Sequence, residues 1–419
     1  MVTQPVDAPV AVADREVLVV GWKAKAIKAL VRHAAVVTSV VDPHEAAKCR
    51  KLGLGATWVA ADPTRAEDVA AVLARHGRSA GDFDAVCSPT ELTVLTASLL
   101  GAAAGNSAIP LDAAVALRDK AVQKESVRRA GLPVASCRVV ATTPDLAGVA
   151  ADGPVVVKPV CGAGSADTYE IGDAGAAESL AARLTEQGLH GPWLVEEFID
   201  GWEAQVDGVI RDGRLRFISV SRYLDNLIRI HDGGLAGSAS LPSARHPELY
   251  RRVGELTSRA LAALGFEDGV FHLEVFVNGE DVVFSECGGR VGGALTDEQL
   301  RHCFDVDIYD EWARSVLRLP SALPEQLPDP EGSVGYIHLT LPQGTVTELP
   351  TQDALTARPG VLHAELDVAV GDVVGDLTTS SHLRAARVLV HGPDEESVTE
   401  DLRKLSQWFR NATVVVPTP

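Results

Sequence analysis

The chain has 419 residues and a mass of 44.1 kDa, a size typical of about three domains. Hydrophobic residues make up 46% and charged residues 23%, which excludes collagen-like, low-complexity and wholly disordered chains. The net charge of −19, without a long basic run, argues against a nucleic-acid partner. No apolar run approaches the ~18 residues of a membrane span, and the first residues lack the pattern of a signal peptide. We therefore expect a cytoplasmic protein with a disordered tail over 1–15.

Short apolar runs alternate with helical patterns in the first quarter of the chain. Strands are predicted at 17–20, 36–41 and 85–87, and helices at 22–32, 45–52 and 92–100. Strands separated by helices indicate a parallel, doubly wound sheet, so we expect an α/β domain over 16–118. A dinucleotide fold is disfavoured, because Lys23 and Ala26 stand where its fingerprint requires glycines.

The later elements favour α+β modules rather than more parallel winding. A helical stretch over 111–132 closes on Gly131 and Pro133, which are typical of a helix end. Strands follow at 134–140, 155–157, 193–199, 206–210 and 215–220, with a helix at 176–189. A proline-rich linker over 319–330 precedes strands at 334–341, 388–390 and 414–416 and a helix at 396–409. We therefore expect a central module over 119–318 and a linker with a small α+β domain over 319–419.

The most informative motif is a buried apolar run that delivers Lys158 and is followed by a loop with Gly162, Gly164 and Ser165. Lysine supplies a point charge, and glycine-rich backbone can turn its N–H groups toward phosphate oxygens without interference from a Cβ atom. The motif therefore indicates polyphosphate binding. It is not a Walker loop, because the lysine precedes the glycines. An ordinary turn with a surface lysine is the alternative interpretation.

Acidic side chains stand in apolar strands further along the chain. Glu196 and Glu197 are adjacent in one strand and must point to opposite faces, so they cannot both lie in the core. Glu274 and Glu286 stand in two strands that flank an Asn-Gly turn. A buried carboxylate needs a cation or hydrogen bonds, and oxygen ligands beside a polyphosphate suit Mg²⁺.

The spacing of Glu274 and Glu286 tests whether they can share a metal. A strict two-residue turn would place the two acids on opposite faces of the hairpin. We therefore predict an odd-numbered loop or a bulge at Val277–Asp281, which would bring them onto one face. Arg290 follows in a run with four glycines, where a guanidinium can approach an anion closely.

These stretches, in this order, resemble the motifs of the ATP-grasp superfamily, and specifically of its ATP-dependent amino-acid (dipeptide) ligases. The similarity is strongest from Leu117 to Ala294, where 117–120 and 129–133 resemble the helix that opens the family's central module. Biotin carboxylase and D-alanine–D-alanine ligase are more distant relatives. The resemblance implies a carboxylate–amine ligase with an ATP cleft between two α+β subdomains, of which the first, over about 134–200, serves as a lid.

The resemblance also implies which side chains contact the nucleotide. They are Lys120 and Lys158 for the phosphates, Gly162, Gly164 and Ser165 in the lid, Glu196, Glu197 and Ile199 for the adenine, and Glu203 for the ribose. Glu274 and Glu286 are the implied ligands of Mg²⁺, for which Mn²⁺ can substitute. Arg290 and Lys158 are the implied catalytic groups, which stabilise the transferring phosphoryl group.

Two positions depart from the family pattern. Gly288 stands where the family often has an asparagine, and Ala166 follows Ser165 where a further glycine is usual. Substrate contacts are predicted at Glu91, Arg222 and His231, with Arg290 added, because the first three lie at a strand end or beside a glycine-rich loop.

The expected reaction begins with attack of a carboxylate on the γ-phosphoryl group of Mg·ATP, which gives an acyl phosphate and ADP. An amine then displaces phosphate and leaves an amide, so amino acids and small carboxylic acids are the expected substrates. An ATP-grasp carboxylase or a carboxylate–thiol ligase is the alternative enzyme, and a catalytically inactive nucleotide-binding regulator is the alternative from another class. The sequence leaves a monomer and a homodimer open.

Overall fold

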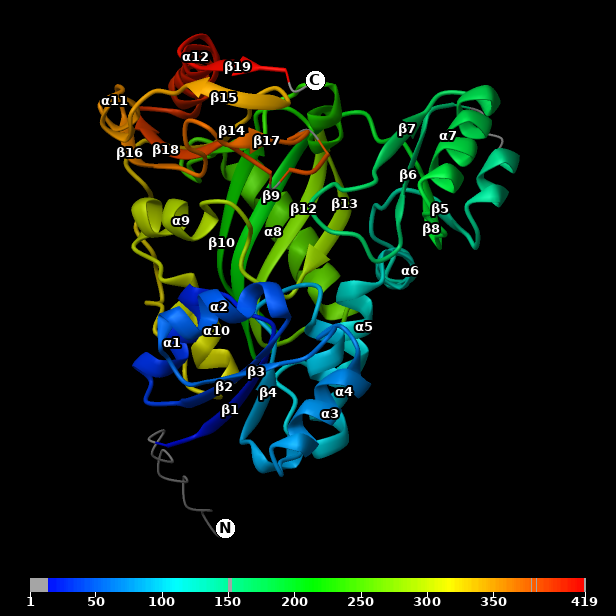
Figure 1. Ribbon diagram of the computed structural model, residues 1–419, viewed down its shortest axis with the longest axis vertical. Helices are drawn as coiled ribbons and strands as arrows, with labels where there is room; N and C mark the ends of the chain where they lie inside the picture. Colours follow the sequence, from blue (N-terminus) through cyan, green and yellow to red (C-terminus); the bar gives the residue numbers. More distant parts are fainter. Residues whose placement is uncertain (1–13, 150–152, 378, 382, 418–419) are drawn as a thin grey trace. The chain divides into compact units, whose positions relative to one another are not determined.

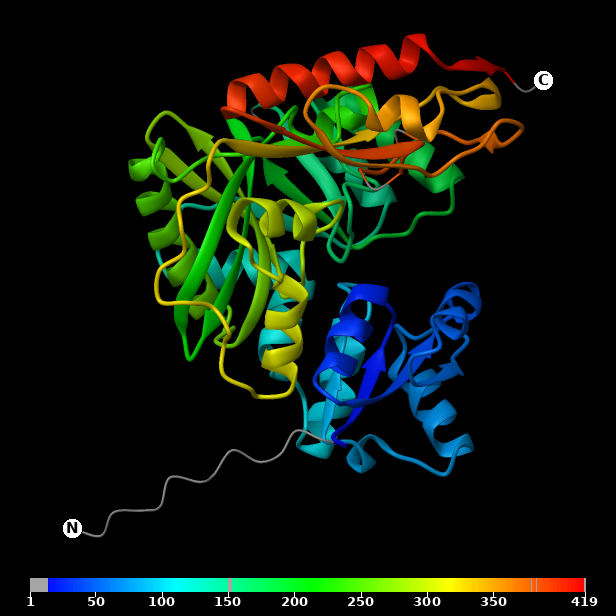
Figure 2. The same ribbon diagram turned by 90° about the vertical axis from the view of Figure 1, so that its left-hand side faces the viewer.

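The computed structural model describes residues 14–149, 153–377, 379–381 and 383–417 (Figures 1 and 2). The chain divides into two compact units. The first contains Met1–Ala114 and Tyr309–Ala322, and the second contains Val115–Ile308 and Leu323–Pro419. Among the described residues, no helix is long and apolar enough to cross a membrane.

The first unit is built on a parallel sheet. Its strand order is β3-β2-β1-β4, with β1 Glu16–Val20, β2 Val36–Val41, β3 Ala56–Val59 and β4 Ala85–Cys87. The intervening helices are α1 Ala24–Arg32, α2 Pro43–Leu52, α3 Ala66–Arg75 and α4 Val94–Ala104. The predicted doubly wound sheet is confirmed, and its core contains Leu18, Val40 and Leu73.

In the second unit, the range predicted to serve as a lid contains a separate small sheet. Its antiparallel strands follow the order β5-β8-β6-β7, with β5 Cys137–Val140, β6 Val155–Pro159, β7 Tyr169–Ile171 and β8 Trp193–Glu197. Helix α7 Ala174–Glu186 packs on this sheet and buries Leu180 and Leu184 against Val157 and Trp193.

An eight-stranded antiparallel sheet forms the centre of the second unit, in the order β13-β12-β9-β10-β11-β14-β18-β16. Its strands are β9 Trp202–Arg211, β10 Arg214–Tyr223, β11 Gly237–Ser240, β12 Gly269–Asn278, β13 Asp281–Gly288, β14 Ser333–Leu339, β16 Val361–Leu366 and β18 Ala386–Gly392. Helices α8 Pro247–Ala263 and α9 Thr296–Phe304 and the short helix η3 Leu227–Asp232 accompany it. The C-terminal strands β14, β18 and β16 therefore extend the same sheet as the central strands.

A small sheet and two helices complete the C-terminal part. The sheet has the order β17-β15-β19, with β15 Gly344–Glu348, β17 Val373–Val374 and β19 Val414–Val416. The helices are α11 Gln352–Thr356 and α12 Glu395–Asn411, and the latter buries Leu402 and Phe409 against β14 and β18. The predicted class, a parallel domain followed by antiparallel modules and a small C-terminal sheet, is confirmed.

The predicted helix over 111–132 is wrong as a single element. It is two helices, α5 Leu111–Arg118 and α6 Lys120–Arg129, because Asp119 adopts an extended backbone and caps α6. The Asp119 carboxylate accepts the N–H groups of the second and third residues of α6 at 2.9 and 3.0 Å. Gly131 lies in the left-handed region with φ +70°, as the predicted helix end requires. Strand β5 begins three residues later than predicted, at Cys137.

Candidate active site

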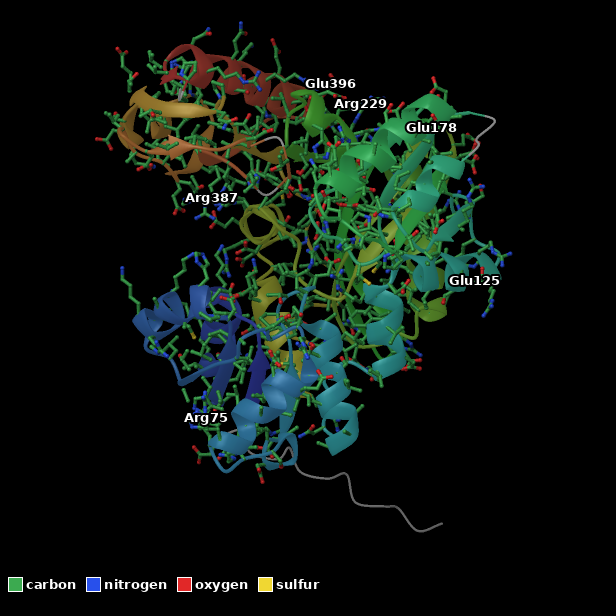
Figure 3. All side chains as sticks on the ribbon, turned by 45° about the vertical axis from the view of Figure 1, so that its right-hand side comes forward. Arg75, Glu125, Glu178, Arg229, Arg387 and Glu396 are labelled. Atoms are coloured by element: carbon green, nitrogen blue, oxygen red, sulfur yellow. The ribbon has the colours of Figure 1, made fainter. Side chains whose placement is uncertain are left out.

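Lysines and carboxylates gather where the lid strands β6 and β8 approach helix α6 and strand β13. Acidic side chains such as Glu178 are exposed at the surface (Figure 3), whereas Glu196 on β8 is only 6% exposed. Its two oxygens lie 2.6 Å from Lys158 Nζ and 2.8 Å from Lys124 Nζ. Burial raises the pKa of Glu196, but the two lysines outweigh burial and hold the pKa below its usual value. Both carboxylate oxygens of Glu196 are therefore engaged in ion pairs with lysines.

Glu286 on β13 contacts two lysines of the same cluster. Lys120 Nζ lies 3.2 Å from Glu286 Oε2 and 3.1 Å from the carbonyl oxygen of Gly162. Lys158 Nζ lies 4.0 Å from the same carboxylate oxygen. Burial raises the pKa of Glu286, but the effect of Lys120 and Lys158 is larger, and the pKa falls to about 2. Glu286 is therefore ionised at neutral pH, and its charge is balanced by the lysines that the sequence assigns to phosphates.

Glu274 on β12 lies directly opposite Glu286 in the hairpin of β12 and β13. The turn at Gly279 contains two residues between the paired strand ends, and this turn alone would put the acids on opposite faces. A register shift beside Glu274 leaves Ser285 as an extra residue in β13, and this bulge brings both acids onto one face. The predicted odd-numbered loop is therefore wrong, and a bulge at 277–281 is wrong in position, because the strands pair regularly beside a two-residue turn.

One oxygen of Glu274 is fixed by a side chain from β10 and by another from β12 itself. The hydroxyl of Tyr223 on β10 donates to Glu274 Oε1 at 3.0 Å, and His272 Nε2 lies 3.6 Å from the same oxygen. His272 Nδ1 lies 2.9 Å from Asp207 Oδ1. Burial lowers the pKa of His272, but Asp207 and Glu274 raise it to about 10, so the imidazole is positively charged. A Cβ atom at position 292 would lie 2.5 Å from Asp207 Oδ1, so any larger residue than Gly292 would displace the Asp207 carboxylate or the local backbone.

Glu274 and Glu286 fit a magnesium ion that arrives with a nucleotide. Among the described residues, no three His, Cys, Asp or Glu side chains are grouped closely enough to hold a metal by themselves. Mg²⁺ commonly binds through one or two carboxylates and completes its shell with phosphate oxygens and water. Gly288, which lies opposite His272 in register, adds no side-chain ligand. The pair of opposed carboxylates therefore suits this mode of binding.

Glu203, at the start of β9, is buried on the sheet face that carries Glu274. Its Oε2 accepts the backbone N–H of Leu227 at 2.8 Å. Burial and the nearby Glu274 raise the pKa of Glu203 to about 8. Glu197 is exposed and accepts the Ser136 hydroxyl at 3.0 Å. Ile199 is half-buried in the segment that joins β8 and β9.

The glycine loop, residues 160–168, joins β6 and β7 and is held by its carbonyl groups. Gly164 and Ser165 both adopt left-handed backbone conformations, with φ of +64° and +57°. Ser165 O lies 3.1 Å from Nε2 of His231, which belongs to η3. The His231 ring also stacks on Tyr169 of β7, with ring centroids 6.4 Å apart. His231 therefore contacts the lid.

Among the other predicted contacts, Arg222 points away from this cluster, Glu91 lies in the first unit, and the charge of Arg290 acts on His272. Arg222 neighbours Tyr223 on β10 and so points to the opposite sheet face, where its guanidinium lies 4.8 Å from the centre of the Trp202 ring. Glu91 belongs to the first unit, in the loop between β4 and α4. Arg290 follows β13, and its Nη1 donates to the backbone carbonyl of the next residue at 3.2 Å.

Lys124 and Tyr223 belong to the cluster although they were not predicted from the sequence. Lys124 is 2% exposed and bridges Glu196 to the backbone carbonyl of Ser285, which its Nζ meets at 2.9 Å. A helical spacing of four residues from Lys120 places Lys124 on the same face of α6, and this spacing could have identified it. Tyr223 has no such local signal, because its role depends on the pairing of β10, β9 and β12.

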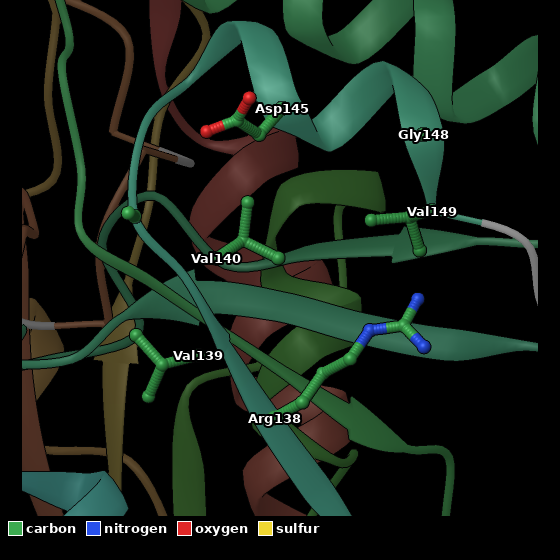
Figure 4. A pocket seen from close by; sticks show the side chains of 7 residues that line it. Arg138, Val139, Val140, Asp145, Gly148 and Val149 are labelled. Atoms are coloured by element: carbon green, nitrogen blue, oxygen red, sulfur yellow. The ribbon is translucent and has the colours of Figure 1, made fainter.

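Two pockets lie outside the cluster. One, of about 760 Å³, is lined by Trp202, Arg222, Arg229 and the residues around η3. The other, of about 380 Å³, lies beside β5 on the lid and is lined by Arg138, Val149 and Asp145 among others (Figure 4). Neither pocket contains a lysine or a carboxylate of the cluster.

Comparisons with known proteins identify the family of the chain. A profile of the ATP-grasp domain matches residues 151–298, and a profile of the L-amino acid ligase C-terminal domain 2 matches residues 337–410. The chain is an ATP-grasp amino-acid ligase. The L-arginine-specific L-amino acid ligase of Bacillus subtilis is 27% identical over 340 residues, which cover 78% of the ligase described here and 80% of that protein.

Solved structures show the same fold over nearly the whole chain. The L-amino acid ligase from Bacillus licheniformis aligns with a TM-score of 0.76 at 16% identity, covering 97% of the ligase and 100% of that chain. The biotin carboxylase domain of the Hydrogenobacter thermophilus 2-oxoglutarate carboxylase, solved with MgADP, aligns with a TM-score of 0.67 at 15% identity, covering 96% and 90%. The predicted family and enzyme class, an ATP-dependent ligase that forms C–N bonds, are confirmed, and ATP-grasp enzymes bind ATP with Mg²⁺.

Proposed function

We propose that the ligase joins two amino acids through an acyl-phosphate intermediate. A carboxylate oxygen of the first amino acid attacks the γ-phosphorus of ATP, the bond to the bridging oxygen breaks, and ADP leaves. The amino nitrogen of the second then attacks the acyl carbon, the bond to the phosphate oxygen breaks, and the amine proton passes to solvent. The convergence of Lys120 and Lys158 on Glu286, with Glu274 opposite, is the observation that supports this route.

Phosphoryl transfer needs positioning and positive charge rather than an enzyme nucleophile. Lys120 and Lys158 supply two ammonium groups beside the glycine loop, and Lys158 carries a pKa above its ordinary value although burial opposes this. Arg290, in the glycine run after β13, would stabilise the developing acyl phosphate. Glycine N–H groups of the lid would complete the phosphate contacts.

Glu274 and Glu286 would hold the magnesium ion. When bound, Mg²⁺ neutralises charge on the phosphate oxygens and fixes their geometry. Mn²⁺ can take the same place, because it accepts the same oxygen ligands. Tyr223 keeps Glu274 oriented for this task through the hydrogen bond at 3.0 Å.

The base and ribose would lie along β8 and the start of β9. Since the Glu196 side chain is paired with two lysines, the adenine contacts would come from the backbone around Glu197 and Ile199. Glu203, with its raised pKa of about 8, would be protonated at neutral pH and could both donate to and accept from a ribose hydroxyl.

The amino acids themselves would bind near Arg290 and under the segment that carries His231. The Bacillus subtilis relative is named for L-arginine, which makes arginine the first amino acid to test here. Arg222 is not included, because it lies on the opposite face of the sheet.

The test is release of ADP, phosphate and dipeptide from ATP across pairs of amino acids, starting with arginine. We expect turnover that requires both amino acids, and Glu286→Gln should lower it at least ~100-fold. Glu280→Gln is the matched control, because Glu280 lies on the same hairpin with a side chain 94% exposed, and it should match the unchanged enzyme. ADP release that depends on bicarbonate would point to a carboxylase instead, and absence of any release would point to a regulator.

A further inference from the structure

Two serines of the C-terminal domain contact the glycine loop of the ATP-grasp domain. The Ser380 hydroxyl donates to the carbonyl oxygen of Gly164 at 2.6 Å, and the Ser381 N–H donates to the same oxygen at 3.0 Å. Ser380 is buried, with 4% exposure. Gly164 lies in the segment matched as an ATP-grasp domain, and both serines lie in the segment matched as the C-terminal domain. The contact therefore joins two domains through a single carbonyl group.

Ser381 is in turn fixed to the central sheet. His338 on β14 is 4% exposed, and its Nδ1 lies 2.9 Å from the Ser381 carbonyl oxygen. Burial lowers the pKa of His338 to about 4, so the ring is neutral near pH 7 and its bond to a carbonyl oxygen requires the proton on Nδ1. A continuous chain of hydrogen bonds therefore runs from the sheet to the lid.

The glycine loop needs such a contact because its backbone is permissive. Gly164 and Ser165 adopt left-handed conformations, and a loop rich in glycine has many competing conformations of similar energy. Two donors on the Gly164 carbonyl select one of them. His231 contacts the next carbonyl, that of Ser165, from η3, so the loop is held from two elements.

We propose that Ser380 is a positioning residue that latches the glycine loop over the reacting phosphates and keeps water from the acyl phosphate. This inference rests on the proposed acyl-phosphate route. If water reaches the intermediate, its oxygen bonds to the acyl carbon, the bond to phosphate breaks, and the free amino acid and phosphate are released. ATP is then consumed without an amide. The C-terminal domain thus contributes to coupling between ATP use and ligation.

The first experiment compares Ser380→Ala with Ser381→Ala in the full-length enzyme. Ser380→Ala removes the hydroxyl donor, whereas Ser381→Ala keeps the backbone N–H and C=O through which Ser381 makes its bonds. With saturating ATP and one amino-acid pair, the ratio of phosphate released through hydrolysis to dipeptide formed should rise about 2- to 12-fold in Ser380→Ala, the effect of one net hydrogen bond. Ser381→Ala should keep the ratio of the unchanged enzyme.

The second experiment measures the latch without activity. Hydrogen–deuterium exchange of peptides that cover residues 160–168 should be faster in Ser380→Ala than in Ser381→Ala, in the absence of nucleotide. If Ser380→Ala matched Ser381→Ala both in hydrogen–deuterium exchange of the glycine loop and in the ratio of hydrolysis to dipeptide formation, Ser380 would not hold the loop. If exchange were faster but this ratio unchanged, Ser380 would hold the loop without excluding water. If the unchanged enzyme releases no ADP with any amino-acid pair, the proposed function fails, and the exchange experiment still decides whether Ser380 holds the loop.

Discussion

Replacement of Glu196 by glutamine tests how the cluster is held together. Glu196 is 6% exposed and pairs with Lys158 at 2.6 Å and Lys124 at 2.8 Å. After Glu196→Gln, Lys124 keeps a neutral carbonyl partner at 2.9 Å, and Lys158 keeps Glu286 at 4.0 Å. Removal of one partner from a buried ion pair commonly costs about 3–5 kcal/mol, because it leaves a buried charge without compensation. We expect a loss of stability in this range.

The adjacent residue provides a matched control. Glu197 is the next residue of the same strand, and its side chain points to the opposite face, where it is exposed and accepts the Ser136 hydroxyl. Glu197→Gln should therefore change stability by less than about 1 kcal/mol. In urea unfolding followed by circular dichroism near pH 7, the midpoint of Glu196→Gln should fall by about 1 M or more, with that of Glu197→Gln close to the unchanged enzyme.

The pH dependence of this difference has a defined sign. Because the pKa of Glu196 is lowered in the folded chain from its usual 4.5, its contribution is complete above that value and is lost as the pH falls toward the folded pKa. The gap between the unchanged enzyme and Glu196→Gln should therefore narrow in acid. Equal midpoints for the two glutamine variants near pH 7 would refute the reasoning.

Two further predictions concern the face of the central sheet that carries Glu274. Tyr223→Phe removes the hydroxyl that orients Glu274. It should weaken binding of the divalent ion in the presence of ADP about 10- to 100-fold, which paramagnetic resonance can follow with Mn²⁺ in place of Mg²⁺. Unchanged affinity would show that Tyr223 does not position the carboxylate of Glu274. The pKa of Glu203 is raised from its usual 4.5 to about 8. Between these two pH values the folded chain keeps a proton on Glu203 that the unfolded chain releases, so the free energy of unfolding falls as the pH rises. Glu203→Gln should flatten this slope in urea midpoints measured across the same pH window, and an unchanged slope would contradict the assignment.

The sequence alone predicted those features that depend on residues close to one another in the chain. Apolar runs located β1, β2 and β4 of the parallel sheet and the two strands that carry Lys158 and Glu196, because buried strands are selected for apolar side chains, whereas β3 was not predicted. The order of charged motifs predicted the family without any contact being known. Asp119 shows the limit of the periodic pattern, since the apolar spacing continues across it while its cap divides the helix.

The remaining features depend on pairing between distant strands. The bulge at Ser285 arises where β13 must match β12, which is itself paired with β9, so the turn at Gly279 carries no record of it. Tyr223 reaches Glu274 across β9, and 51 residues separate them in the chain. Ser380 reaches Gly164 over 216 residues. No residue pattern near either end of these contacts signals the other.

At the proposed ATP site, the charges of the cluster predict that nucleotide and metal bind together. Each lysine assigned to phosphate already has a carboxylate partner, Lys120 with Glu286 and Lys158 with Glu196. ATP alone would have to compete with these buried ion pairs and would leave Glu286 beside the triphosphate, with like charges repelling. In this proposal, Glu286 would instead turn from Lys120 to a divalent ion that accompanies the phosphates, and this movement would free the ammonium group for the triphosphate. Glu196 would keep Lys124 and Lys158 in place during this exchange, because each of its oxygens is paired with one of them.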